Sequence, residues 1–373
     1  MKVSRAQVLA YRIAAQGLHR DANAVADLAV LDIGVQEAFG QPAGYAFASR
    51  LADVANVDPP VGPGHRLAYA WTLRGSPHVH RRADLDALAG ALWPLSEADA
   101  TGRLNESWPS VKRAGIPALE QFETAVREMR AAVTKATGKG AVSTAVTKKL
   151  PKAMRRECRT CKTSHISDSA MRLASLPAGL ELQPGTSPPV LEPRKGAKLP
   201  KRTDHAALTK LAHAYLRLLG PATVGEFAGY LEARRADVAE VWSDDGLTEV
   251  PVDGKAAWLP ADCVDALRTA PEPDLVRLLG PFDPYLQARD RALIVPDKSV
   301  HKAMWPVMGR PGALLVEGEI AGIWRTRASG GKLTITVEPF GPQPKSVWAE
   351  IDDEAQRVAH VRSAQDVSVV RKD

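Results

Sequence analysis

"DHAALTKLAHAYLRLLG" (204–220) is the clearest indication in the sequence of how this chain folds. Its apolar residues recur at helical spacing up to a final glycine, so we expect an amphipathic helix. "PATVGEFAGYL" (221–231), with proline in its first turn, predicts a second helix, and "RRADVAEVW" (234–242) predicts a third. "LTEVPVDGKAAWLP" (247–260) has the pattern of a hairpin with an Asp-Gly turn. Three helices followed by a hairpin are the order of elements in a winged-helix domain.

The same order occurs, less clearly, at the N-terminus. Residues 4–18 begin with a serine suited to helix capping and have apolar residues at helical spacing. Shorter helices are predicted at 23–31 and at 42–51, which has proline at its start. Residues 65–82 alternate like a pair of strands around a Gly-Ser-Pro turn. These elements predict a first winged-helix domain.

Two more helices are predicted after the first hairpin, at 84–93 and 117–136. The pattern then recurs, since 139–151 has the pattern of a short helix–turn–helix with basic residues at its end. A strand is predicted at 178–184. The segment 184–202 is rich in proline, glycine and lysine and has the composition of a linker between domains.

The C-terminal part of the chain has the pattern of a β-sheet. "RALIVP" (291–296), "GALLVEGEIAGIWRTR" (312–327) and "KLTITVEPF" (332–340) each predict strands. We therefore predict an α+β chain with three tandem winged-helix domains and a C-terminal β element. The predicted domains are 1–110, 111–200 and 201–275, and the β element is 276–373.

Composition and charge limit the classes of protein to which the chain can belong. Of its 373 residues, 45% are hydrophobic and 25% are charged, and no apolar run approaches the length of a membrane span. The N-terminus lacks the cleavage region of a signal peptide, and three cysteines do not suggest a disulfide framework, so we expect a cytoplasmic protein. A net charge of +6 favours a polyanionic partner. The sequence has no phosphate-binding loop or dinucleotide fingerprint, so we expect no nucleotide cofactor.

Three polar residues lie close together in "LAVLDIGVQEAFGQPAGYAFASRL" (28–51), a segment otherwise made of small and apolar residues. They are Asp32, Gln36 and Glu37. From the residues alone two interpretations stay open: a helix cap followed by a solvated turn, or a reaction centre.

Five short motifs, taken together, resemble the bacterial winged-helix DNA glycosylases of the AlkZ- and YcaQ-like type. They are "AAQGL" (14–18), "GVQEA" (34–38), "WTLRGSPHVH" (71–80), "PFDPYLQARDR" (281–291) and "GEIAGIWRTR" (318–327). The resemblance implies three winged helices in a C-shaped arrangement around duplex DNA and excision of alkylated purines. It also implies that some members remove bulky adducts or crosslinks formed by antibiotics and protect the producing bacterium.

The resemblance also implies a catalytic signature, Gln–apolar–Gln or Gln–apolar–Asp, in the segment 28–51. Gln36 matches its first glutamine, whereas Glu37 and Ala38 depart from it, so the acidic role falls either on Glu37 or on Asp32. A carboxylate can stabilise the cationic sugar and take the proton of the attacking water. The amide of Gln36 can hold that water without adding charge. An alkylated purine is already cationic and leaves without being protonated.

Several basic residues are candidates for DNA contacts. His78 and His80 alternate on a predicted strand and therefore share a face; neither has an evident third metal ligand nearby. The basic side chains on the predicted hairpins either contact phosphate or are only solvated. Arg289 lies next to Asp290 and could instead form a local ion pair with it. The predicted DNA-binding residues are His78, His80, Arg81, Arg82, Arg289, Arg325, Arg327 and Lys332.

Cys158, Cys161 and His165 have a spacing that suggests zinc, but a structural zinc site needs four ligands. Free cysteines are therefore the better interpretation, and we expect neither a metal nor any other cofactor.

Two functions follow from these patterns. The first is a monofunctional DNA glycosylase that acts on alkylated purines in duplex DNA. The second is a non-catalytic winged-helix DNA-binding protein, such as a regulator. Regulators usually bind as dimers, whereas this chain carries three predicted units and no coiled-coil heptad, so we expect a monomer that holds DNA.

Overall fold

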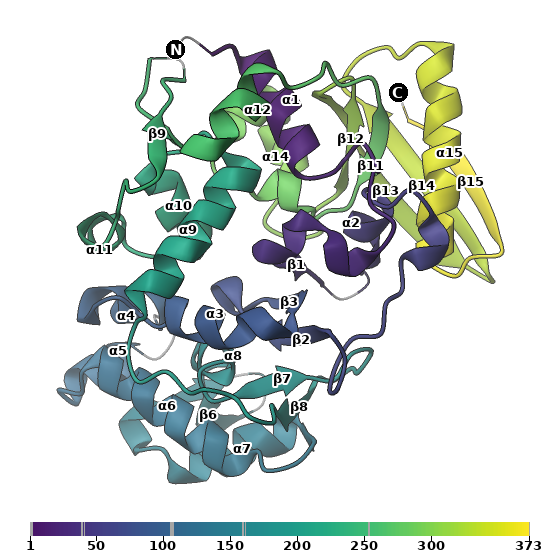
Figure 1. The fold of residues 1–373 in the computed structure, drawn as a ribbon. Helices are drawn as coiled ribbons and strands as arrows, with labels where there is room; N and C mark the ends of the chain where they lie inside the picture. The colour runs from purple at the N-terminus through teal and green to yellow at the C-terminus, as the bar shows by residue number, and fades with distance from the viewer. Residues whose placement is uncertain are drawn as a thin grey trace. The chain divides into compact units, whose positions relative to one another are not determined.

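The structure is a computed structural model that describes residues 3–38, 40, 42–104, 108–158, 160, 162–252 and 254–372. The chain divides into two compact units, each made of several segments (Figure 1). Unit 1 comprises Met1–Pro59, His213–Glu226 and Asp244–Asp373, and unit 2 comprises Pro60–Ala212 and Phe227–Ser243. No helix in the described part of the chain is both long and apolar enough to cross a membrane. The division into four domains stays a prediction.

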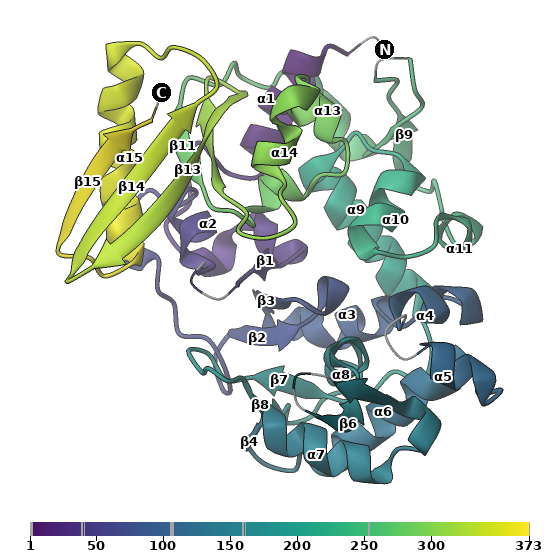
Figure 2. The same ribbon diagram turned by 180° about the vertical axis from the view of Figure 1, so that it is seen from behind.

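A five-stranded sheet is the largest element of unit 1 (Figure 2). Neighbouring strands are antiparallel except for the last pair, which is parallel and joined by the helix α15 (Lys345–Val361). Leu333, Ile335 and Val337 alternate along one strand and pack with Trp348 and Ile351 of α15. The strands, in spatial order, are β11 (Val276–Leu279), β12 (Gly312–Val316), β13 (Glu319–Ser329), β14 (Lys332–Pro339) and β15 (Asp366–Arg371).

Of the strands predicted in the C-terminal part, most are confirmed and one is wrong. The strands predicted in 312–327 and 332–340 are confirmed. The strand predicted at 291–296 is wrong, because α13 (Arg291–Ile294) forms there. A short apolar run fits a buried helical turn as well as a strand, and the Asp290 carbonyl accepts the amides of Leu293 and Ile294. The 17-residue helix α15 was not predicted at all.

The N-terminal part of unit 1 is built from short elements. The predicted first helix is confirmed as α1 (Arg5–Ala15). Ser4 and Gln7 form a capping box at its N-terminus. The helix predicted at 23–31 is wrong, because two 3₁₀ turns form there instead (Val25–Asp27 and Ala29–Asp32). The other elements of unit 1 are β1 (Val35–Gln36), α2 (Gly44–Ala48), a 3₁₀ turn (Val54–Asn56), β9 (Leu247–Glu249), β10 (Trp258–Pro260), α12 (Val264–Arg268), a 3₁₀ turn (Pro284–Gln287) and α14 (His301–Met304).

Unit 2 contains a hairpin, a helical layer and a small sheet. Strands β2 (Leu67–Trp71) and β3 (Pro77–Arg81) pair antiparallel, which confirms the hairpin predicted at 65–82. Strands β4 (Thr137–Gly138), β8 (Val190–Pro193) and β7 (Leu180–Leu182) form a sheet in that order. Its helices and second hairpin are α3 (Leu85–Ala91), α4 (Glu97–Arg103), α5 (Trp108–Arg113), α6 (Ala118–Ala132), α7 (Lys139–Lys149), β5 (Arg155–Cys158), β6 (Thr163–Ile166), α8 (Asp168–Ser175) and α11 (Arg235–Glu240).

Two further helices, α9 (His205–Leu219) and α10 (Val224–Leu231), contain the boundaries between the units. With α11 and the hairpin β9–β10 they confirm the elements predicted from 204 to 260.

Candidate active site

The three polar residues of the segment 28–51 stand at a sharp turn of the chain. Asp32 ends a 3₁₀ turn and is exposed, and Gly34 follows with φ +77°, a conformation that favours glycine. Val35 and Gln36 then form the short strand β1, in which Val35 is buried and Gln36 is half-buried. The turn thus presents Gln36 at the surface of unit 1, on a strand that Val35 anchors in the core.

Gln36 lines a very small pocket. The pocket has a volume of about 10 Å³, which is the lower limit for a single water molecule and far too small for a purine. Its other lining residues come from the start of α2 and from the loop after β11: Pro42, Tyr45, Ala46, Gly280, Pro281, Phe282 and Asp283. Gly280 is required there, because a Cβ would lie 2.9 Å from the Cβ of Tyr45.

Glu37 and Asp32 do not line this pocket. The Glu37 Oε2 accepts the backbone N–H of Ala43 at 3.4 Å, next to the first residue of α2. Both carboxylates therefore lie close to Gln36 in the chain, but of these three residues only Gln36 lines the pocket.

A buried ion pair forms the support of the pocket. Arg50 and Asp283 have no exposed side-chain surface and are joined by two hydrogen bonds of 2.8 and 2.7 Å. Arg50 also donates to the backbone carbonyl of Gln16, at 2.9 Å, and to its Oε1, at 3.0 Å. Asp283 accepts the backbone N–H of Tyr285 as well, and so caps the 3₁₀ turn Pro284–Gln287. Sequence reasoning missed Arg50 and Gln16, although an arginine within an apolar run is a signal of a buried pair.

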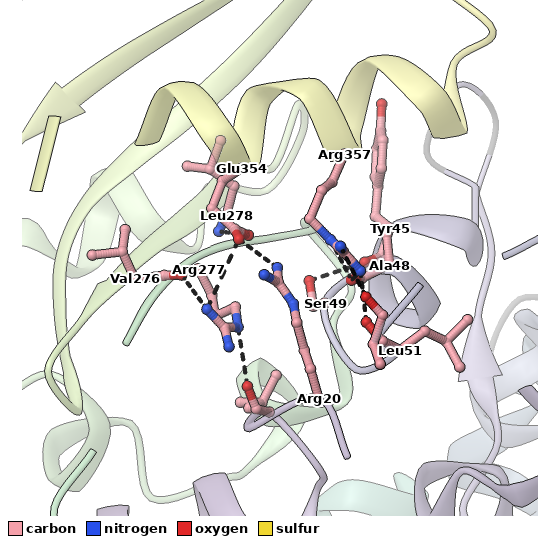
Figure 3. A network of polar contacts seen from close by, with 12 residues as sticks. Arg20, Tyr45, Ala48, Ser49, Leu51, Val276, Arg277, Leu278, Glu354 and Arg357 are labelled. Carbon is pink, nitrogen blue, oxygen red and sulfur yellow. Dashed lines mark hydrogen bonds and ion pairs between the residues drawn. The ribbon is translucent and has the colours of Figure 1, made fainter. Parts of the chain in front are cut away.

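A second polar network ties α2 to α15 (Figure 3). Glu354 on α15 forms an ion pair with Arg20 and accepts the backbone N–H of Leu278 at 3.3 Å. Arg357, one turn further along the helix, donates to the carbonyl oxygens of Ala48, at 2.9 Å, and Leu51, at 2.6 Å. Desolvation, and then the nearby Arg20, lowers the pKa of Arg277 to about 10. The helix that carries one wall of the pocket is thereby fixed to the C-terminal sheet.

His78 and His80 are buried, with exposed fractions of 2% and 1%. Thr72 Oγ1 lies 3.0 Å from His78 Nδ1 and 3.0 Å from His80 Nε2, so one hydroxyl joins both rings. Burial, and then the charge of His80, lowers the pKa of His78 well below 6.5. The two rings share a face as expected, but they do not face solvent. The DNA-binding role predicted for them would require exposure of both rings.

The predicted arginine contacts differ in accessibility. Arg82 forms a two-bond ion pair with the buried Glu181, at 3.0 and 2.9 Å, and donates to the His65 carbonyl, so it supports the fold of unit 2. Arg81 and Arg289 are half-buried. Asp290, expected to pair locally, instead binds the buried Arg12 at 2.6 and 3.0 Å. The residues that remain exposed are Arg325, Arg327 and Lys332 on β13 and β14.

The cysteine motif lies on the hairpin β5–β6. Cys158 is half-buried, and Cys161 lies outside the described residues. A hydrogen bond with the Ile166 carbonyl, 2.6 Å from Nδ1, raises the pKa of His165. Among the residues with a described position, no three His, Cys, Asp or Glu side chains are grouped to hold a metal ion.

Comparisons with known proteins bear on the whole chain. The sequence model of a family described as DNA glycosylase AlkZ-like matches residues 25–361. The interstrand DNA cross-link repair glycosylase of Streptomyces sahachiroi is 29% identical over 180 residues; the matched part spans 46% of this chain and about half, 46%, of that relative. The structure of Streptomyces sahachiroi DNA glycosylase AlkZ has the same fold, with a TM-score of 0.76 over 100% of both chains at 20% identity. The predicted resemblance and the α+β class are thus confirmed, and the chain belongs to the AlkZ-like DNA glycosylase family.

Proposed function

We propose that this protein is a monofunctional DNA glycosylase that hydrolyses the N-glycosidic bond of alkylated purine nucleotides in duplex DNA. The observation that carries the proposal is the family match over residues 25–361, which includes the whole segment 28–51. Similarity to an interstrand cross-link repair glycosylase extends the proposed substrates to bulky adducts and crosslinks, such as those formed by antibiotics. Removal of such lesions would protect the producing cell.

The proposed chemistry places one water beside Gln36. Hydrolysis develops positive charge on the sugar and needs a water molecule on the face opposite the leaving base. The pocket that Gln36 lines has room for about one water, and an amide can both donate to it and accept from it. Glu37 or Asp32 would supply the carboxylate that takes the proton of that water; since neither lines the pocket here, that carboxylate would have to approach the water when DNA binds. Because an N7-alkylpurine is already cationic, no general acid is needed.

We further propose how the chain holds DNA. The succession α6, α7, α8 and the hairpin β7–β8 in unit 2 supports the second of three winged-helix domains. The exposed side chains of Arg325, Arg327 and Lys332 suit phosphate contacts, which are independent of sequence. We also propose that the chain is a monomer that surrounds the duplex in a C shape, and that it is located in the cytoplasm.

The test is release of free base from a duplex that contains one N7-methylguanine. We expect the wild-type chain to release the base and to leave an abasic site whose strand breaks only after alkali. An identical duplex without the lesion is the control. A gel shift without released base would contradict the proposal and favour a non-catalytic DNA-binding protein.

Single variants test the residues. Gln36→Ala and Glu37→Ala should each slow base release at least about tenfold, since positioned acid–base groups contribute about 10²–10⁴-fold and a cationic leaving group demands less. Asp32→Asn decides between the two carboxylates, and the exposed Asp58→Asn is the matched control. Wild-type rates in Q36A, E37A and D32N would mean that the segment is only a cap and a turn.

A further inference from the structure

The loop that follows α14 (Figure 2) and leads into β12 carries two strongly exposed apolar side chains. Val307 is 103% exposed and Met308 is 85% exposed. The next most exposed large hydrophobic residue among those the structure describes is Val370, at 45%. Single exposed apolar residues are common on proteins, but two neighbours that are almost fully exposed leave apolar area in water at a cost in free energy.

The loop is held at both ends, so its tip is presented in a defined place. Trp305 on one side is buried and packs edge-on against His301, and Pro311 on the other side is buried. Gly312 then passes so close to Trp324 that a Cβ would lie 2.3 Å from the indole ring. The two apolar side chains therefore project from anchored backbone.

Contacts of the loop connect it to the candidate active site. The guanidinium of Arg310 lies over the ring of Phe282, 5.3 Å from its centroid, and Phe282 lines the pocket beside Gln36. On the other side, Arg325 Nη1 donates to the carbonyl of Gly309 at 2.5 Å. The tip thus lies between the wall of the proposed water pocket and the exposed cations of β13.

The charge around the tip indicates what it meets. Arg310 lies in the loop, Arg325 donates to its backbone, and the exposed Arg327 follows two residues later on the same strand, so a polyanion is attracted to this surface. Two apolar residues are too few for a stable protein interface, which buries about 800 Å² on each partner. Proteins that bend DNA insert such side chains, methionine among them, between neighbouring base pairs while arginines hold the phosphates.

We propose that Val307 and Met308 form a wedge that enters the base stack of duplex DNA next to the nucleotide from which Gln36 and its water release the base. This inference rests on the proposed glycosylase function. Partial unstacking would expose the sugar carbon of the lesion to the water pocket, which is too small to take the base itself.

The test uses a duplex with 2-aminopurine beside N7-methylguanine, because 2-aminopurine fluoresces more strongly when it is unstacked. Binding of the wild-type chain should raise the fluorescence at least twofold, and V307S/M308S should abolish the rise. The double variant should release base at least tenfold more slowly from the paired duplex. Its defect should shrink to less than threefold when the lesion lies opposite an abasic site, since that step is already poorly stacked. V307I/M308L should behave as wild type, and V370S is the control for loss of an exposed apolar side chain.

The outcomes separate the wedge from the proposed function. If wild type raises the fluorescence but releases no base from any substrate, the glycosylase proposal fails and the wedge stands. If V307S/M308S unstacks and releases base like wild type, the wedge proposal is wrong. A defect of the double variant that is equally large opposite the abasic site also overturns it, because the loop then acts on a step other than unstacking.

Discussion

His78 is a single side chain that makes the folded state depend on pH. Its Nδ1 lies 2.9 Å from the Ser76 carbonyl oxygen and 3.0 Å from Thr72 Oγ1, and the ring is buried. Burial, followed by the nearby charges of His80 and Arg74, lowers its pKa well below 6.5. An unfolded chain, in which this histidine keeps its ordinary pKa, therefore binds a proton that the folded chain excludes.

We predict that the protein loses stability as the pH falls below about 6.5. The contribution of His78 is complete above the unfolded-state pKa and is lost as the pH falls toward the lower folded-state pKa. Between pH 7.5 and pH 5.5 the free energy of unfolding by urea should therefore fall, because the unfolded chain takes up a proton on this ring that the folded chain excludes. His78→Asn should remove this part of the pH dependence, whereas the exposed His205→Asn should not. The same pH dependence in H78N and wild type would show that the ring takes up its proton in the folded state.

Single residues also show how far the sequence predicts the site. The polar segment around Gln36 was found from its composition, because three polar side chains stand out among apolar neighbours. The pairing of Arg50 with Asp283 could not be found, since the two lie 233 positions apart and no local pattern records such a contact. The burial of His78 and His80 was missed for a related reason: strand alternation shows that two side chains share a face, but not whether that face is covered.

At the scale of elements, the ion pair between Arg50 and Asp283 joins the end of α2 to the loop that follows β11. Both side chains are fully buried, and Arg50 makes further hydrogen bonds to Ala46 and Gln16. Removal of one partner would leave a desolvated charge without its counterion, which usually costs about 3–5 kcal/mol. Replacement of both by apolar residues of similar volume avoids that cost.

We therefore predict that Asp283→Leu lowers the free energy of unfolding by about 3–5 kcal/mol. The double variant R50M/D283L should be more stable than D283L alone, because it leaves no uncompensated charge. The control is Asp265→Leu, which breaks the solvent-exposed pair with Arg268 and should cost less than about 1 kcal/mol. Urea unfolding of the four proteins measures these differences. Equal stabilities of D283L and R50M/D283L would mean that the uncompensated charge of Arg50 costs little.

Helices and strands were predicted correctly where the periodic pattern in the sequence was long and regular. The helix α9 and the strands β13 and β14 are long and regular in sequence, and all three were predicted. Errors occurred where the signal was short: the residues of α13 suit a strand by composition, but backbone bonds to Asp290 close a helical turn. The helix α15 was overlooked because its neighbours on both sides are strands, although its buried residues recur at helical spacing.

For the molecule as a whole, the distribution of charge is very uneven. Residues 139–166, which form α7 and the hairpin β5–β6, contain eight lysines and arginines and one glutamate, a formal charge of +7. The whole chain carries +6, so the remaining 345 residues together carry −1. The positive excess that suggested a polyanionic partner therefore belongs to one region of unit 2.

The helix α8, which follows this region, has one face covered by another part of unit 2. The helix α8 packs on the hairpin β2–β3, with the Arg172 guanidinium 5.3 Å from the centroid of Trp71, and its Asp168 binds Lys139. By contrast, Lys148 and Lys149 at the end of α7, Lys152 after it and Lys162 in the hairpin are exposed. None of these four lysines forms an ion pair with a residue of the described ranges. The backbone N–H of Ile166 donates to Thr147 Oγ1, and Arg155 donates to the Leu150 carbonyl, so both bonds fix the hairpin to the end of α7.

If duplex DNA is the partner, these four lysines should carry a large part of its salt-dependent binding. We predict that K148Q/K149Q/K152Q/K162Q binds undamaged duplex at least tenfold more weakly at low salt. The slope of log affinity against log salt concentration should become less steep by about three to four, since each lost phosphate contact accounts for about 0.9. The matched control, K112Q/K201Q/K255Q/K345Q, removes four exposed lysines elsewhere and changes the net charge equally, so its slope should change by less than about one. Because phosphate contacts do not read sequence, two unrelated duplexes should give the same result. Equal losses in the two variants would mean that DNA responds to net charge alone and that α7 and its hairpin are no special contact.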